Sequence, residues 1–506
     1  HSLFLRPSLF FLCVLPNILN GFHVSSYVFL GHIPNDMWCG INDFKGSDWT
    51  TDQIRNISAS GLTSQGCTIW NWDYSKLSQM SFEEALIYTN RLDRPEEISC
   101  KSQPNTNFEY DEMGTSIVSE WDLVCERAVL RTSTQVLISI GKFLGASFFG
   151  ILSDKYGRKT SFMLGSTFYI FGSLLTTAAP WYFLFLIGRM ALGSASSGLF
   201  YPAFALLSEN ISVQHRSWMS IAFSASYPIG MLFLSLAAYL IRPWRYLQLA
   251  LTIPAFLLII NCLVTTVVIK TVVFSRARCE EKVQILHRIK NCFNEFRGLY
   301  GPSRIRRMAF TCYFMWCVVS LCYYVTALNA DNLAANRYLY VAFTGCVDIP
   351  SYILPMILLR FTGRKQTAVT MFGIAAVSLL AVVAIPQENK TWLVVLAMLG
   401  RFGISGVYSV VTLHTAELFP TTIRNSALGT SSTMAHVGSI IAPYVVDVLG
   451  SLAWFIPTTI CGGSVLVAGL LMLTLPETNS GKLEDHVEHE EKTNKYTTYA
   501  PKVPKH

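Results

Sequence analysis

The feature that most constrains this chain is a series of apolar runs, each about as long as a membrane-spanning helix. A helix rises about 1.5 Å per residue, so a bilayer core of about 30 Å needs about 20 mostly apolar residues. Twelve such runs cover 8–30, 132–153, 160–178, 182–208, 218–240, 246–269, 309–328, 338–360, 367–386, 391–413, 426–449 and 452–475. The sequence therefore predicts an all-α membrane protein with twelve transmembrane helices.

The composition also fits a chain that lies mostly in lipid. Of the 506 residues 14% are charged and 51% are hydrophobic, whereas soluble domains are about 25% charged. This balance excludes a disordered or fibrous chain and argues against a soluble enzyme. The sequence shows no phosphate-binding loop, metal-ligand cluster or catalytic triad, so we expect no catalytic residue, no metal and no cofactor. The net charge of +7 does not indicate nucleic-acid binding, because no basic stretch is interleaved with a soluble fold.

Basic residues in the short loops predict the orientation, because cytoplasmic loops are enriched in Lys and Arg. With the N-terminus inside, the inner loops carry Lys155, Arg158, Lys159, Arg216, Arg364, Lys365 and Arg424. Both termini are then cytoplasmic, and we expect a multi-pass protein of the plasma membrane. The expected units are a first helix at 1–30, an extracellular loop domain at 31–131, the rest of an N-terminal six-helix half at 132–269, a cytoplasmic loop at 270–308, a C-terminal half at 309–475 and a cytoplasmic tail at 476–506.

The segment 31–131 is too long to be a simple linker. It contains four cysteines, Cys39, Cys67, Cys100 and Cys125. On the oxidising side of the membrane they predict two disulfides, with three possible pairings. Asn56 begins an Asn-Ile-Ser sequon in this segment, so we expect it to be glycosylated.

The two halves of the chain contain matching motifs in the same order. This pattern predicts two parallel six-helix halves with a central site between them. The matches are Gly157-Arg158-Lys159 with Gly363-Arg364-Lys365 at an offset of 206, Gly188-Arg189 with Gly400-Arg401 at 212, Glu209 and Arg216 with Glu417 and Arg424 at 208, and Gly230 with Gly438 at 208.

The repeated charges lie at the expected inner ends of the spans. Each glutamate can pair with the arginine of the turn in its own half, which would lock or release a cytoplasmic gate. The alternative is that these residues only anchor the helices at the inner surface. The expected gating residues are Asp154, Arg158, Lys159, Glu209, Arg216, Arg364, Glu417 and Arg424.

The turn at 150–159 resembles the signature of the major facilitator superfamily. Further segments resemble its solute-carrier organic cation, anion and carnitine transporters; they are 120–125, 244–250, 348–350, 416–425 and 475–478. The resemblance implies the major facilitator fold and transport of small organic ions, including carnitine-like zwitterions, by alternating access. The sequence departs from the pattern of these transporters in two segments. The loop 31–131 has four cysteines instead of six, and the stretch after span six lacks a Pro-Glu-Ser-Pro-Arg-Trp-Leu-like motif.

Two ionisable residues are expected at mid-membrane depth, where burial is costly and function is the default hypothesis. His436 lies in span eleven, where the resemblance implies Asp in cation transporters and Arg in anion and carnitine transporters. Lys142 lies halfway along span two and has two interpretations, a ligand for an anionic group or an internal pair with an acid of the other half. Asp348 is either a counter-charge to one of these residues or, as we prefer, a structural group at a helix kink. Asp447, near the outer end of span eleven, is expected to be solvated.

Aromatic residues complete the expected site, because their rings contact the apolar part of an organic ion and attract quaternary ammonium groups. The resemblance implies cavity positions for Phe200, Tyr227, Trp316 and Tyr323. The expected substrate-binding residues are Lys142, Phe200, Tyr227, Trp316, Tyr323, Tyr324, Arg401, Tyr408 and His436. The basic residues favour anions or zwitterions and the aromatics suit cations, so the sign of the substrate stays open.

The predicted function is therefore a carrier of small organic ions in the lipid bilayer, with no nucleic-acid partner and an unpredicted oligomeric state. Two alternatives stay open. One is a transport-inactive relative that acts as a receptor or interaction protein. The other is a major facilitator carrier for a neutral, sugar-like solute, against which Lys142 and His436 argue.

Overall fold

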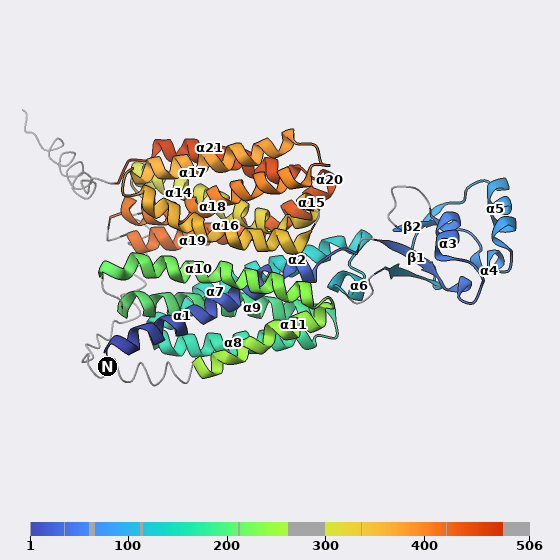
Figure 1. Cartoon of the computed structure of the whole chain (residues 1–506), viewed down its shortest axis with the longest axis horizontal. Coiled ribbons are helices and arrows are strands. Elements are labelled where there is room, and N and C mark those ends of the chain that lie inside the picture. Colours follow the sequence, from blue (N-terminus) through green and yellow to red (C-terminus); the bar gives the residue numbers. More distant parts are fainter. Residues whose placement is uncertain are drawn as a thin grey trace, which may run out of the picture.

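The computed structural model describes residues 2–34, 36–59, 66–111, 115–210, 213–261, 299–334, 336–420 and 423–478. In these residues the chain is a bundle of long helices with a small domain at one end (Figure 1). We call the end of the bundle that carries the small domain the outer end, and the opposite end the inner end. The stretch after span six that departs from the resemblance, and most of the predicted tail, lie outside the described residues.

Helices matching all twelve predicted spans run along the bundle in the described part of the chain. They are α1 (Ser2–Ser25), α7 (Ala128–Tyr156), α8 (Arg158–Ala178), α9 (Tyr182–Asn210), α10 (Val213–Leu240), α11 (Trp244–Thr252) continued by η3 (Ile253–Phe256), α14 (Ser303–Leu328), α16 (Arg337–Leu358), α17 (Arg364–Ala381), α18 (Lys390–Leu418), α19 (Arg424–Tyr444) and α21 (Ile456–Thr474). By length and composition, ten helices of the described residues can cross a membrane. Helix α1 packs against α9 and α10, and α8 packs against α9, so both belong to the same bundle.

The helix pairings repeat between the two halves. Helix α1 packs against α10 and α8 against α9, as α14 packs against α19 and α17 against α18. A β carbon at Gly230 would lie 2.2 Å from the carbonyl oxygen of Ile18, and one at Gly438 would lie 2.2 Å from that of Cys317. These two repeat glycines therefore permit the same close helix crossing in each half. The halves meet where α7 contacts α19 and where α10 contacts α16.

The matched glycines of the inner turns have different structural roles. Gly157 has a φ of +90°, a conformation that favours glycine strongly. Gly363 has a φ of −73°. A β carbon at Gly363 would lie 2.3 Å from a carboxylate oxygen of Glu477, so a larger residue there would displace the Glu477 side chain.

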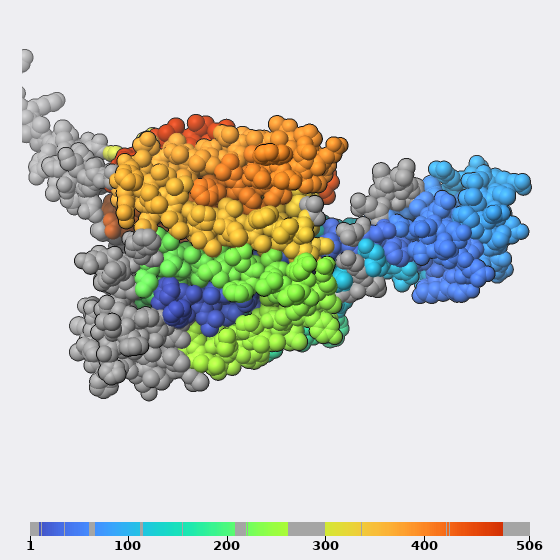
Figure 2. All heavy atoms as spheres, viewed as in Figure 1, coloured from blue at the N-terminus to red at the C-terminus, as the bar shows by residue number. Residues whose placement is uncertain are grey.

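The small domain, which we call the loop domain, lies between α2 (Tyr27–Leu30) and α7. Its strands form two antiparallel pairs, β1 (Met37–Ile41) with β4 (Thr106–Tyr110) and β2 (Thr68–Trp70) with β3 (Glu97–Ser99). The helices α3 (Thr51–Ser58), α4 (Tyr74–Leu77) and α5 (Phe82–Arg91) lie beside these strands. The domain projects clear of the bundle beyond a narrower neck (Figure 2).

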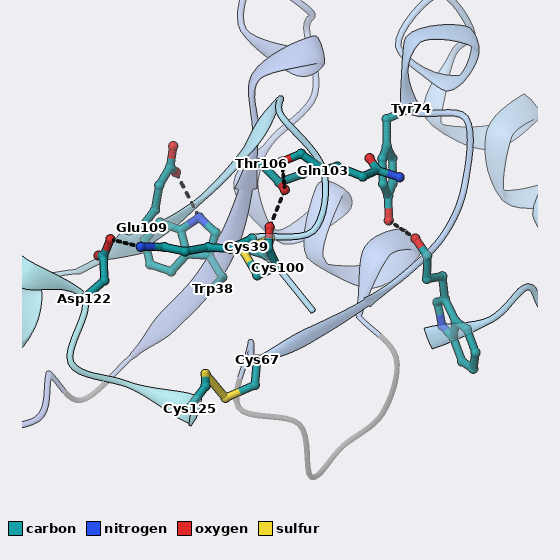
Figure 3. The surroundings of a disulfide bond; sticks show 12 residues. Trp38, Cys39, Cys67, Tyr74, Cys100, Gln103, Thr106, Glu109, Asp122 and Cys125 are labelled. Carbon is teal, nitrogen blue, oxygen red and sulfur yellow. Dashed lines mark hydrogen bonds and ion pairs between the residues drawn. A yellow bond between two sulfur atoms is a disulfide. The ribbon is translucent and has the colours of Figure 1, made fainter. Parts of the chain in front are cut away.

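Two disulfides staple the loop domain (Figure 3). Cys39 is bonded to Cys100, and Cys67 is bonded to Cys125, so both predicted disulfides are present in one of the three possible pairings. Two-stranded sheets are marginally stable alone, and covalent links compensate for a small core. The second disulfide ties the domain to the start of α7, because Cys125 lies in η2 (Cys125–Arg127) directly before that helix.

A further contact fixes the base of the loop domain to the bundle. Glu120 lies in α6 (Ile117–Trp121) and forms an ion pair with Arg245 of α11. Its carboxylate also accepts a hydrogen bond from the Trp244 indole nitrogen at 2.7 Å. Two of the segments that carry the family resemblance, 120–125 and 244–250, therefore meet here.

Candidate functional site

A cavity of about 250 Å³ lies between the two halves of the bundle. Seven of the nine expected binding residues line it: Lys142, Phe200, Tyr227, Tyr323, Tyr324, Tyr408 and His436. Eleven further lining residues are Asn17, Asn20, Ser196, Ser197, Tyr201, Ser224, Ser320, Tyr352, Ser409, Ser432 and Ala435. The lining therefore combines aromatic rings with hydroxyl and amide groups, and among its described residues Lys142 is the single formal charge if His436 is neutral.

Lys142 joins the two halves through a hydrogen bond to an uncharged partner. Its Nζ, on α7, donates to the hydroxyl of Tyr324 on α14 at 3.0 Å. Among the residues that the structure describes, Lys142 has no ion-pair partner, and the cavity lining contains no Asp or Glu. The structure thus offers no acidic partner for the internal-pair interpretation of Lys142.

His436 lies across the interface from Lys142, on α19. Its ring makes an edge-on contact with Phe143 of α7, with centroids 6.3 Å apart. Its Nε2 is buried and has no hydrogen-bond partner within the described structure. This nitrogen is therefore free to bond a ligand in the cavity that His436 lines.

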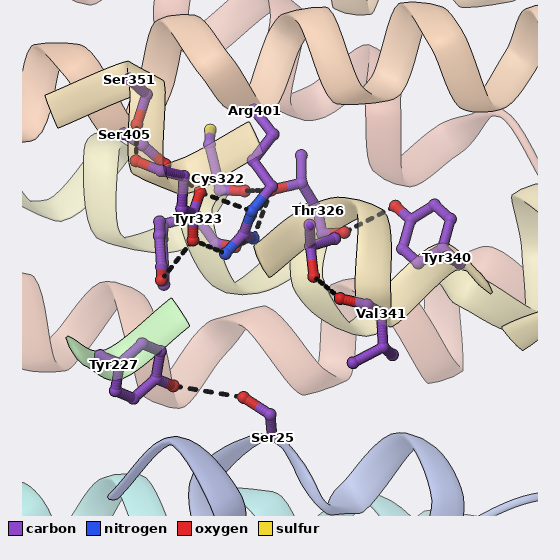
Figure 4. A network of polar contacts seen from close by, with 12 residues as sticks. Ser25, Tyr227, Cys322, Tyr323, Thr326, Tyr340, Val341, Ser351, Arg401 and Ser405 are labelled. Carbon is purple, nitrogen blue, oxygen red and sulfur yellow. Dashed lines mark hydrogen bonds and ion pairs between the residues drawn. The ribbon is translucent and has the colours of Figure 1, made fainter. Parts of the chain in front are cut away.

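Among the described residues, Asp348 pairs with Arg401 and with neither Lys142 nor His436. Figure 4 shows Arg401 in this network, beside Tyr323, Thr326 and Ser405. The Arg401 Nη2 lies 2.7 Å from Oδ2 of Asp348, its Nε lies 2.9 Å from Oδ1, and both side chains are 0% exposed. Hydroxyls of Ser405 and Tyr323 donate to the same carboxylate at 2.7 and 3.1 Å. Asp348 therefore has a structural role, as we preferred, but it acts as the counter-charge of Arg401.

Two expected binding residues, Arg401 and Trp316, do not line the central cavity. Arg401 extends from α18 to α16 inside the C-terminal half, where its Nε and Nη2 bind Asp348 and its Nη1 donates to the Tyr323 carbonyl at 3.0 Å. Trp316 is buried and donates its indole N–H to the Thr415 hydroxyl at 3.1 Å. Its ring contacts Tyr408, which does line the cavity, so Trp316 packs against a lining residue.

Arg189, which matches Arg401 in the repeat, has uncharged partners among the described residues. Its guanidinium donates to the carbonyl of His23 at 3.1 Å, to the Ser26 hydroxyl at 3.0 Å and to the Gln135 amide oxygen at 3.2 Å. Arg189 is 1% exposed, and in the described part of the chain no carboxylate pairs with it. Asp348 therefore neutralises Arg401 in the C-terminal half, whereas Arg189 is bonded to uncharged groups in the N-terminal half.

At the outer end, a polar cluster that we call the outer latch joins the halves; it consists of Tyr27, Arg131, Thr132 and Asp447. Asp447, in η5 (Val445–Leu449), forms an ion pair with Arg131 of α7. It also accepts hydrogen bonds from the hydroxyl of Tyr27 and, at 2.8 Å, from that of Thr132. The side chains of Arg131 and Asp447 are 9% and 7% exposed, so the expectation of a solvated Asp447 was wrong.

An outer chamber of about 740 Å³ separates the outer latch from the loop domain. Arg131, Thr132 and Asp447 line it from the bundle, and Asp36 and Arg55 line it from the loop domain. Asp36 and Arg55 form two hydrogen bonds of 2.6 and 2.8 Å. This bonding raises the pKa of Arg55, so the guanidinium of Arg55 stays charged at physiological pH.

At the inner end, the predicted contact between a glutamate and the arginine of its turn is present in the C-terminal half. Arg364 lies 3.0 Å from Glu417, whose carboxylate also accepts from the Thr478 hydroxyl at 2.7 Å. Glu477 accepts from the backbone N–H groups of Arg364 and Lys365 at 2.8 and 3.1 Å, so segment 475–478 closes this turn.

Other expected gating residues have different surroundings. Arg158 donates to the hydroxyl of Ser153 at 2.9 Å, and Arg424 donates to the carbonyl of Phe419 at 3.3 Å. Lys159 is half-buried at the start of α8. The side chains of Asp154, Glu209 and Arg216 fall outside the described part of the structure.

Comparison with known proteins identifies the family. The model of the Major Facilitator Superfamily matches residues 132–359 and 349–503. The chain belongs to this superfamily. It is therefore a multi-pass membrane protein with a carrier fold, and this superfamily comprises transporters, not enzymes.

Relatives place the chain in one branch of the major facilitator superfamily. An "organic cation transporter protein" of Drosophila melanogaster is 30% identical over 96% of this chain and 91% of its own length. "Solute carrier family 22 member 16" of Xenopus laevis is 30% identical, with 80% of this chain and 76% of the relative covered. The human protein of that name is 29% identical, with 94% and 88% covered. The chain therefore belongs to the solute carrier family 22 group.

Among solved structures, a D-xylose–proton symporter superposes with a TM-score of 0.59 at 13% identity, covering 95% of this chain and 99% of its own. This likeness shows the shared major facilitator fold.

Proposed function

We propose that this protein carries small organic ions across the plasma membrane by alternating access, with the central cavity as its substrate site. The observation that carries the proposal is a cavity between two repeat-related halves, lined by aromatic rings and one cation. Rings of this kind contact the apolar part of an organic ion, and the relatives include an organic cation transporter protein.

The outer latch supports an alternating-access cycle. It holds α2 and α7 of one half to η5 of the other, on the outer side of the cavity. This arrangement suits a state in which the outer path is closed and substrate exchanges at the inner side. Rocking of the halves would break the latch, and the contact of Arg364 with Glu417 would regulate the inner side.

The expected orientation agrees with the chemistry of the two ends. The loop domain carries both disulfides, which require an oxidising compartment, so we infer that the outer end faces the extracellular space. Asn56 is exposed on α3, where a glycan would be accommodated. The basic inner turns then face the cytoplasm, with both termini.

A neutral-solute carrier fits this cavity less well. An unpaired lysine in an otherwise uncharged lining costs desolvation energy that a sugar would not compensate. The similarity to a xylose carrier concerns the fold and gives no support to a sugar substrate.

Uptake into cells expressing the full chain tests the proposal. Three labelled probes would be a quaternary ammonium ion, carnitine and an aromatic carboxylate. We expect saturable uptake of at least one, and its loss in Ser409→Trp, because the indole would fill the cavity that Ser409 lines. Val377→Trp is the matched control, because Val377 is 71% exposed on α17.

No uptake of any probe by protein shown at the cell surface would contradict the carrier proposal. That result would favour a transport-inactive receptor or interaction protein. Equal uptake by Ser409→Trp and the unmodified chain would instead remove the cavity from the transport path.

A further inference from the structure

The internal repeat relates Lys142 to Asp348. The offset of 206 that matches Gly157 with Gly363 also matches Lys142 on α7 with Asp348 on α16. Arg189 on α9 likewise matches Arg401 on α18. The C-terminal half therefore places an acid and an arginine at these two positions, whereas the N-terminal half places two cations there.

This difference leaves the central region with excess positive charge. Asp348 and Arg401 neutralise one another, with both side chains fully buried. Lys142 bonds the hydroxyl of Tyr324, and Arg189 bonds one carbonyl, one hydroxyl and one amide oxygen. Within the described residues, neither cation has a carboxylate, and none lines the cavity. A buried charge without a counter-ion is strongly destabilising, so a negative ligand at this place would be bound favourably.

We propose that the substrate supplies this missing negative charge: Lys142 binds the carboxylate or sulfonate of an organic anion. This inference rests on the proposed carrier function and adds the substrate's sign. The Lys142 ammonium would then exchange or share its Tyr324 partner with the anion, while the rings of Tyr227 and Tyr408 contact its apolar part. The unpartnered Nε2 of His436 would supply a second hydrogen bond from α19. Contacts from α7 and α19 would connect the two halves through the ligand.

A cationic substrate is disfavoured by the same geometry. An ammonium group in the cavity would meet Lys142 without a carboxylate among the described lining residues to offset the repulsion. At close range in a site of low effective dielectric constant, this repulsion exceeds the attraction that aromatic faces offer a cation.

The test uses the full chain in cells and three probes that share one aromatic body: a carboxylate, its neutral amide and a trimethylammonium analogue. The variants are Lys142→Met, which keeps the length and removes the charge, and Lys142→Arg, which keeps the charge. We expect carboxylate uptake to fall at least about tenfold in Lys142→Met and to be largely retained in Lys142→Arg. Lys45→Met, at an exposed site in the loop domain, is the control and should leave uptake unchanged.

Binding by purified protein provides a second measurement if Lys142→Met reaches the surface poorly. The carboxylate probe should raise the melting temperature of the unmodified chain, and this shift should shrink in Tyr324→Phe, which removes the hydroxyl that positions Nζ. If the unmodified chain takes up the ammonium or amide probe, and Lys142→Met takes it up equally well, the anion assignment is overturned. The carrier function would stand in that case. Absence of both uptake and thermal shift with every probe would overturn the carrier function itself.

Discussion

Replacing Asp348 by asparagine is expected to lower the free energy of unfolding by about 3–5 kcal/mol. The change would leave Arg401 charged and fully buried without its counter-ion. It would also weaken the hydrogen bonds from Ser405 and Tyr323, which would no longer meet an anion. The effect should appear as a much lower melting temperature of purified protein and a smaller fraction at the cell surface.

An exposed ion pair provides the control for the Asp348 variant. Asp36→Asn makes the same chemical change in the loop domain, where Asp36 and Arg55 are 46% and 35% exposed, so a loss of at most about 1 kcal/mol is expected. Combining Asp348→Asn with Arg401→Met should recover much of the stability, because no buried charge then lacks a partner. A melting temperature of Asp348→Asn equal to that of the unmodified chain would contradict the assigned role of this pair.

Replacing Asp447 by asparagine is expected to open the outer end of the bundle. The change removes the charge closest to Arg131, a carboxylate that also accepts hydrogen bonds from Tyr27 and Thr132. It leaves Arg131 the carboxylate of Asp331, at 4.0 Å. Hydrogen bonds to charged groups contribute about 1.5–3 kcal/mol. The outward-open population should therefore increase roughly tenfold to a hundredfold, provided that only the closed state contains these bonds.

A cysteine introduced at Ser196 in the cavity reports this opening. Its labelling by a membrane-impermeant thiol reagent should be faster in the Asp447→Asn background than in the unmodified one. Asp447→Glu, which keeps the charge, should show a smaller change. Asp122→Asn, which alters an ion pair with Lys101 in the loop domain, should show none. Equal labelling rates in all backgrounds would show that the outer latch does not control access.

The membrane-spanning part of the fold was predictable because lipid imposes a strong requirement on each helix. Apolar length alone indicated all twelve ranges, and the repeated motifs indicated the two halves. Gly230 and Gly438 show why such motifs carry structural information, since each permits a helix to approach a carbonyl oxygen of its neighbour. The two disulfides followed from the number of cysteines, but their pairing depends on how the strands fold.

The partners of buried charges were not predictable from the sequence alone. Asp348 had several cations at similar depth, and only the packing of α16 against α18 selects Arg401. The outer latch was missed because Arg131 and Asp447 lie near span ends, where charged residues are ordinarily solvated. The signal that was present is one acid, Asp447, inside an otherwise uncharged run at 426–449. Asn17 and Asn20 in span one, which line the cavity, were also detectable as polar residues at membrane depth.

Reversible cross-linking across the outer latch tests the central claim most directly. Thr132 and Asp447 are joined by a side-chain hydrogen bond of 2.8 Å between the two halves, so cysteines at both positions should be linked by a short bifunctional thiol reagent. Each single-cysteine variant receives the same treatment as a control. If the halves alternate access to the cavity, linked protein at the cell surface should stop uptake, and reductant should restore it. Undiminished uptake by fully linked protein would contradict the account.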